Sequence, residues 1–87
     1  MLAEGVWRAA GDVGLSIPAD LSVVSFDDAP WMSLVVPGLT AVDQDEEALG
    51  AAAVNRLLER IADPDAGPTT ITMPTRLVHR ASTRALP

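Results

Sequence analysis

An apolar run from Leu21 to Phe26 ends abruptly in two adjacent carboxylates, Asp27 and Asp28. Short apolar runs of β-branched and large residues, entered here through Pro18, are typical of buried strands. In open α/β sheets, ligands bind beyond the carboxyl ends of the strands, which is where these acids fall. A carboxylate in that position can accept hydrogen bonds from vicinal hydroxyl groups, as it would from a sugar.

The two acids are expected to have different roles, because successive side chains of a strand point to opposite faces of the sheet. Asp27 should face the ligand crevice; the alternative is that it only ends the strand in an Asx turn. Asp28 should cap a short helix that opens with Pro30 and runs to about Leu34. A carboxylate at that spacing accepts hydrogen bonds from the first free amides of a helix.

Two helices are expected to flank these elements. Residues 2–13 carry apolar side chains at spacings of three and four, and Gly14 supplies a left-handed C-terminal position. Residues 45–62 begin with three acids, which the helix dipole favours, and continue as a broad apolar stripe. A short strand over 39–42 and an extended segment over 70–80, interrupted by Pro74, complete the pattern.

Composition excludes several classes of function. The 87 residues allow one small domain, and a net charge of −6 with only six Lys and Arg argues against a nucleic-acid surface. The absence of cysteine excludes disulfides and thiolate chemistry. No run approaches the ~20 apolar residues that span a membrane. Residues 2–13 contain charged side chains rather than the apolar core of an export signal, so we expect a cytoplasmic protein.

A longer series of short motifs follows in a fixed order along the chain. They are Gly14-Leu15-Ser16-Ile17-Pro18-Ala19-Asp20-Leu21-Ser22-Val23-Val24, Phe26-Asp27-Asp28, Pro37, Leu39-Thr40, Val42, Gln44, Leu49-Gly50, Ala53, Leu77-Val78, Arg80 and Ser82-Thr83. In this order and spacing they resemble the C-terminal part of the effector-binding domain of LacI/GalR-type bacterial transcription regulators. The resemblance covers about residues 2–83.

The resemblance implies a fold. Such sensor domains are similar to the sugar-binding proteins of the bacterial periplasm, in which two α/β lobes surround a cleft that closes on a small ligand. The implied class is α/β: a partial periplasmic-binding-protein-like fold with parts of two Rossmann-like lobes, mostly parallel strands and flanking helices. Residues 1–87 would form one partial sensor domain. Residues 2–40 would belong to the second lobe, the helix 45–62 to the first, and 70–83 to a returning strand, with no DNA-binding domain.

The resemblance also implies site residues. Asp27 matches the strand-end aspartate that contacts the ligand, and Gln44 matches a hinge-proximal polar residue that many members turn toward it. Alternatively, Gln44 only satisfies backbone groups where a strand meets a helix. Trp31 is a third candidate, since an indole can stack on a sugar face, although it can equally serve for packing. The expected dimer interface consists of Val6, Trp7, Leu34, Val35 and Val36.

The favoured interpretation is a C-terminal part of the sensor domain of a ligand-responsive repressor. It would bind a sugar- or nucleoside-like effector and form a homodimer or pair with full-length relatives. DNA would be reached only through a domain missing from this chain. No cofactor, metal or membrane partner is expected. Two alternatives remain: a sugar-binding protein of a transport system, and a remnant that acts only as an interaction module.

An enzyme is not expected, because the single histidine, His79, has no acid and nucleophile at a recognisable spacing. The acids between Asp43 and Glu47 are explained by a solvated helix start rather than by a cation site. Arg80 is expected to anchor the returning strand through backbone carbonyls or a carboxylate.

Overall fold

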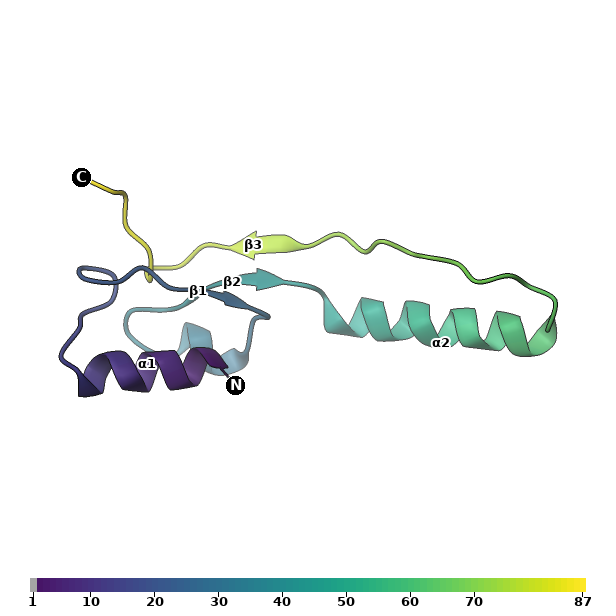
Figure 1. Cartoon of the computed structure of the whole chain (residues 1–87), viewed down its shortest axis with the longest axis horizontal. Helices are drawn as coiled ribbons and strands as arrows, with labels where there is room; N and C mark the ends of the chain where they lie inside the picture. The colour runs from purple at the N-terminus through teal and green to yellow at the C-terminus, as the bar shows by residue number, and fades with distance from the viewer. Residues whose placement is uncertain (1) are drawn as a thin grey trace.

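The structure, a computed structural model, describes residues 2–87 and has an elongated shape of 57 × 25 × 19 Å. Its elements follow the order α1 (Leu2–Asp12), β1 (Val24–Phe26), η1 (a 3₁₀ helix, Pro30–Ser33), β2 (Thr40–Asp43), α2 (Glu46–Ala62) and β3 (Arg76–Val78). α1 and η1 lie on one side of the sheet, whereas α2 extends beyond the end of β2 (Figure 1).

The three strands form one mixed sheet in the order β1-β2-β3. β1 and β2 are parallel, with Ser25 opposite Ala41, and β3 returns antiparallel to β2, with Leu77 opposite Val42. The predicted α/β class is confirmed. Because β1 and β2 run in the same direction, the residues that follow them emerge at the same edge of the sheet.

α1 ends in the turn that its glycine predicts. Gly14 has a φ of +79°, its N–H donates to the carbonyl of Gly11 at 3.2 Å, and the Leu15 N–H donates to that of Ala10 at 2.9 Å. These two bonds form a Schellman motif, which satisfies carbonyls that the helix itself leaves free. The observed helix agrees with the predicted range 2–13.

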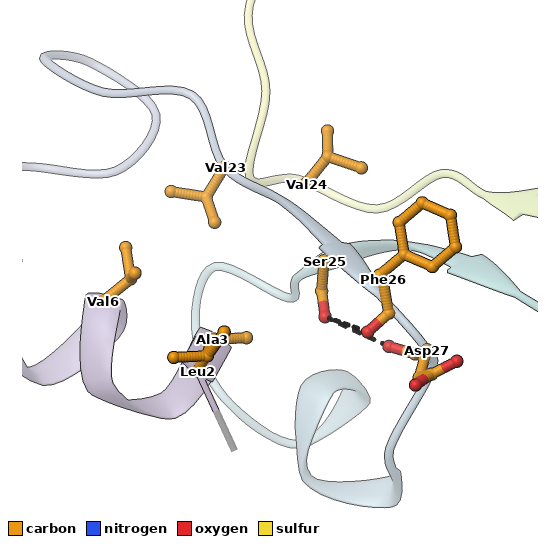
Figure 2. A pocket seen from close by; sticks show the side chains of 8 residues that line it. All are labelled: Leu2, Ala3, Val6, Val23, Val24, Ser25, Phe26 and Asp27. Atoms are coloured by element: carbon orange, nitrogen blue, oxygen red, sulfur yellow. Dashed lines mark hydrogen bonds between the residues drawn. The ribbon is translucent and has the colours of Figure 1, made fainter.

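β1 is shorter and more exposed than its sequence predicts. The apolar run 21–26 predicts a buried strand, whereas β1 contains three residues and only Ser25 among them is buried. The side chains of Val24 and Phe26 are 53% and 70% exposed, because they point away from α1 (Figure 2). Helices cover only one face of the sheet within residues 2–87, so alternate residues of β1 face solvent.

The small core lies between α1, η1 and β2. Met32, Leu39 and Ala41 are fully buried at its centre, and the half-buried indoles of Trp7 and Trp31 pack against them. So few buried side chains supply little hydrophobic stabilisation. Polar contacts between segments far apart in the sequence also join the strand ends.

α2 is the longest element and the least covered. Asp45, the first of the three acids at the predicted helix start, caps it, since its carboxylate accepts a hydrogen bond from the Ala48 N–H at 3.2 Å. Along the fully described stretch Glu46–Ala62, no residue is buried, and apolar side chains such as Leu57 and Ile61 face solvent. Among residues 2–87, no helix has the length and apolar character needed to cross a membrane.

Candidate ligand-binding site

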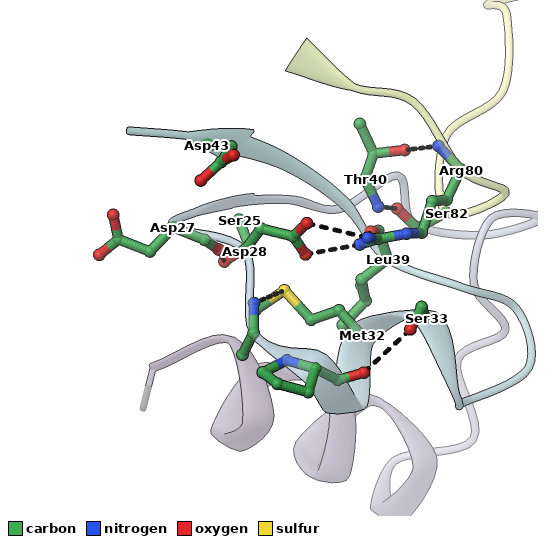
Figure 3. A network of polar contacts seen from close by, with 12 residues as sticks. Ser25, Asp27, Asp28, Met32, Ser33, Leu39, Thr40, Asp43, Arg80 and Ser82 are labelled. Atoms are coloured by element: carbon green, nitrogen blue, oxygen red, sulfur yellow. Dashed lines mark hydrogen bonds and ion pairs between the residues drawn. The ribbon is translucent and has the colours of Figure 1, made fainter. Parts of the chain in front are cut away.

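Asp27 leaves β1 in an unusual backbone conformation. Its φ is +72°, in the left-handed region that residues with a Cβ rarely adopt. Its N–H donates to the Val42 carbonyl at 2.8 Å, and the Ser25 hydroxyl donates to the Asp27 carbonyl at 3.1 Å. The side chain consequently projects beyond the strand end and away from η1 (Figure 3).

Gln44 directly follows β2 and meets Asp27 at this edge of the sheet. Its Nε2 donates to Oδ1 of Asp27 at 2.6 Å, and both residues are half-buried. The sheet thus brings together two of the three predicted ligand-binding residues, from positions 17 apart in the sequence. Within residues 2–87, Oδ2 of Asp27 and Oε1 of Gln44 accept no side-chain hydrogen bond, so both can accept bonds from a bound molecule.

A hollow of about 400 Å³ lies between α1 and β1, with Asp27 at its rim (Figure 2). Its lining is apolar apart from Ser25 and Asp27. The single hydrogen of the Ser25 hydroxyl is shared between the carbonyls of Phe26 and Asp27, so this hydroxyl can only accept a hydrogen bond from a ligand. The charged group of the hollow is the Asp27 carboxylate at its rim.

Asp28 does not cap η1, so that prediction is wrong. Ala29 occupies the cap position, and the Asp28 carboxylate instead faces Arg80 (Figure 3). Oδ1 and Oδ2 of Asp28 accept hydrogen bonds from Nη1 and Nη2 of Arg80 at 2.8 and 2.9 Å. A bidentate ion pair engages both carboxylate oxygens in charge-assisted hydrogen bonds, whereas an N-cap contact engages one of them. It therefore prevails over local capping.

Arg80 anchors the returning segment, as its sequence context predicts. Its Nη1 also donates to the Leu39 carbonyl at 2.7 Å, and its backbone N–H donates to Oγ1 of Thr40 at 3.0 Å. The side chains of Arg80 and Asp28 are only 20% and 21% exposed. The Arg80 hydrogen bond lowers the pKa of the Asp28 carboxyl below its ordinary value of 3.8, and the same bond raises the pKa of Arg80.

Ser82 completes this polar network, and the sequence did not single out its role. Its hydroxyl donates to the Val23 carbonyl at 2.6 Å and accepts from the Thr40 N–H at 2.8 Å. It is fully buried. The Ser82-Thr83 pair belongs to the motif series, but only the three-dimensional arrangement shows that one hydroxyl connects the segments before β1 and at the start of β2.

Trp31 is not brought together with Asp27 and Gln44. It packs against the core and lines a separate hollow of about 520 Å³ with Trp7 and Val35, and neither Asp27 nor Gln44 lines that hollow. A shared contact between Trp31 and the two strand-end residues is therefore absent from the described structure, residues 2–87.

The residues predicted to form a dimer interface divide into two groups. Val6, Leu34 and Val36 are exposed, the last two by 80% and 91%. Trp7 and Val35 are half-buried. Exposed apolar side chains thus remain on α1 and on the segment after η1, while the indole of Trp7 serves the core.

A family model described as a periplasmic binding protein-like domain matches residues 1–83. The chain is 42% identical over 87 residues to the HTH-type transcriptional regulator MalR of Streptomyces coelicolor, an alignment that covers all of this chain and 25% of MalR.

Two solved structures show the same arrangement. A LacI family transcriptional regulator from Enterococcus faecalis with bound ribose is 34% identical, with a TM-score of 0.89 over 98% of this chain and 32% of that one. The lac repressor dimer bound to operator and the anti-inducer ONPF is 38% identical, with a TM-score of 0.79 over 93% of this chain and 28% of that one. The chain thus spans between a quarter and a third of the length of these relatives.

Proposed function

The chain belongs to the periplasmic binding protein-like domain family and corresponds to part of the sensor domain of LacI-type transcription regulators, and on that basis we propose that it forms one wall of an effector-binding cleft. The effector is a small, neutral molecule with several hydroxyl groups, such as a sugar or nucleoside. The protein binds this effector as a signal and does not convert it chemically.

The contact between Asp27 and Gln44 carries this proposal. The 2.6 Å bond uses one carboxylate oxygen of Asp27 and turns the amide so that its oxygen remains an acceptor. The pair then offers two acceptors and a negative charge at the edge of the sheet where ligands of α/β folds bind. Hydroxyl groups satisfy such acceptors, whereas a phosphate or carboxylate would be repelled.

The relatives support the regulatory part of the proposal. One solved relative holds ribose, and another is a repressor dimer bound to operator. We propose that the protein acts in the cytoplasm, that DNA is bound by parts of such a regulator outside the matched region, and that effector binding shifts the equilibrium between lobe arrangements. The exposed side chains of Val6, Leu34 and Val36 are proposed to contact a second copy.

The test uses a chimeric sensor domain, in which residues 2–83 replace the matching third of the ribose-bound regulator from Enterococcus faecalis. Calorimetric titration should show ribose binding and no binding of ribose 5-phosphate. Asp27→Ala should cost about 2 kcal/mol, a roughly thirtyfold weaker Kd, because hydrogen bonds to a charged acceptor are lost. Gln44→Ala should cost about 1 kcal/mol, since its bonds are uncharged.

Asp12→Ala, which removes an exposed acid at the far end of α1, is the matched control and should leave the Kd unchanged. An unchanged Kd in Asp27→Ala would contradict the proposal, as would tighter binding of the phosphorylated sugar than of ribose.

A further inference from the structure

We propose that Arg80 is a positioning residue for the ligand-binding carboxylate: by holding Asp28, it fixes the direction in which Asp27 points. The inference rests on the proposed function of Asp27, because only a ligand-binding carboxylate needs a fixed direction. Arg80 itself contacts Asp28 and Leu39 and reaches Asp27 only through the chain.

The conformation of Asp27 requires support from its surroundings. A residue with a Cβ in the left-handed region costs about 1–2 kcal/mol, so it persists only where neighbouring contacts over-determine it. Asp27 has this conformation, with a φ of +72°, and lies between a three-residue strand and a single-turn 3₁₀ helix. Neither element is long enough to impose it alone.

The two sides of Asp27 are held independently. On the N-terminal side, the Asp27 N–H is bound to the Val42 carbonyl at 2.8 Å. On the C-terminal side, Arg80 holds both oxygens of Asp28 at 2.8 and 2.9 Å and the Leu39 carbonyl at 2.7 Å. Both sides are thus fixed to β2 or to the residue before it. Gln44, which receives the Asp27 carboxylate, follows the same strand.

The site is shaped for an arginine. The planar guanidinium fork matches the geometry of both carboxylate oxygens and leaves Nη1 a further bond to a carbonyl, whereas a lysine ammonium fits this arrangement less well. Gly38 leaves the required space, since a Cβ at that position would lie 3.2 Å from Cδ of Arg80. The Gly38 carbonyl also accepts a bond from the Ala81 N–H at 3.1 Å. Gly38 thus lies against the Arg80 side chain and also binds the backbone of the next residue.

The sequence provides a direct reporter of the Asp27 direction. Gln44 is the only glutamine and Asn55 the only asparagine of the chain, so its nuclear magnetic resonance spectrum contains two side-chain amide groups. The Gln44 amide donates to Asp27, whereas Asn55 is exposed on α2. The Gln44 signal therefore reports the contact and the Asn55 signal is an internal reference. The spectrum of Asp27→Ala gives the chemical shift of the Gln44 amide in the absence of this contact.

In the full 87-residue chain, Arg80→Met should move the Gln44 amide signal to the position seen in Asp27→Ala and speed its hydrogen exchange. Arg80→Lys, the conservative variant, should restore part of the shift. The indole signals of Trp7 and Trp31 should stay dispersed, which separates a lost direction from a lost fold. The matched control is Arg76→Met: Arg76 pairs with Asp43 at 3.7 Å beside Gln44, but is 77% exposed.

Asp28→Asn is the second variant, because it keeps the size of the side chain and removes the charge that Arg80 binds. It should shift the Gln44 signal as Arg80→Met does. An unmoved Gln44 signal in both variants overturns the proposal, as does an equal shift in Arg76→Met. If the Gln44 contact and the dispersion of the indole signals are lost together in both variants, the proposal is also overturned. In that case the ion pair between Asp28 and Arg80 stabilises the whole fold rather than the direction of Asp27. No ligand is added, so failure of ribose binding would affect only the proposed function.

Discussion

Asp28 and Arg80 show how strongly one residue depends on a partner far along the chain. Their side chains are about four fifths covered, and 52 positions separate them. A covered pair with two parallel hydrogen bonds is screened less by solvent than an exposed ion pair. Its effect on folding should therefore be measurable, unlike that of the exposed pair between Glu4 and Arg8.

The stability of the chain should fall in acid partly through Asp28. Its pKa is lowered in the folded state, so the unfolded state binds more protons below about pH 4. Its stabilising contribution is present above that pH and is lost as the pH falls through the lower, folded-state pKa. Urea unfolding between pH 6 and pH 2.5 should show a shallower loss in Asp28→Asn than in the wild type.

An Arg80→Met background provides the control. There, Asp28→Asn should change the pH dependence little, because the bond that lowers the pKa is already gone. Equal effects of Asp28→Asn in both backgrounds would show that Arg80 is not the cause.

The same residues mark what the sequence could predict about the site. The position of Asp27 beyond a strand and of Gln44 beyond the next follows from the strand pattern, and the structure brings them into contact. The role of Asp28 could not be predicted, because helix capping is judged from neighbours in the sequence. Its partner, Arg80, lies 52 positions away, after β3. The sequence allows Trp31 either to stack on a ligand or to pack, and the structure shows that it packs against the core from within η1; its contact with a ligand stays a prediction.

At the scale of elements, the helices were predictable and the burial of the strands was not. α1 and α2 follow from local periodicity and their end signals, which a chain carries in itself. The burial of β1 depends on what covers each face of the sheet, and one face of β1 is open in residues 2–87. Apolar character alone therefore predicted a longer and more buried strand than the structure contains.

The end of α1 should be sensitive to the left-handed conformation of its glycine. A Cβ on Gly14 or on Gly5 would meet open space, so packing does not distinguish them, but only Gly14 has a positive φ. Gly14→Ala should destabilise the chain by about 1 kcal/mol, and Gly5→Ala, inside the helix, should stabilise it by about 0.5–1 kcal/mol. Chemical unfolding followed by circular dichroism would measure both changes in the free energy of unfolding. If both variants were stabilised, or both destabilised, the role given to the left-handed conformation of Gly14 would be contradicted.

The whole molecule is too extended for its size. Its radius of gyration is 18.3 Å, whereas a compact chain of this length would have about 12 Å. The excess comes from α2 and residues 63–75, which extend away from the sheet (Figure 1). Apolar side chains along α2 and on the open face of β1 remain exposed, as expected when about a third of a larger domain is present.

Self-association should depend on the proposed dimer surface rather than on exposed apolar groups in general. Val36 and Leu86 are both 91% exposed, but only Val36 lies in the segment after η1. Sedimentation velocity should show that Val36→Asp weakens the dimer by about tenfold or more, since a valine buried on association contributes roughly 1.5 kcal/mol. Leu86→Asp is the matched control and should leave the dimer intact; the reverse pattern would remove the basis for this interface.

The buried hydroxyl of Ser82 limits how far the chain can be shortened from its C-terminal end. One oxygen atom binds both the Val23 carbonyl and the Thr40 amide, so cutting the chain before this residue would remove the partner of a buried amide and of a part-buried carbonyl. Removing only the last three residues would spare that atom and the Arg84 amide that binds Ser22. The last three positions are thus dispensable in a way that position 82 is not, because Ser82, unlike them, joins the segment before β1 to the start of β2 through its side chain.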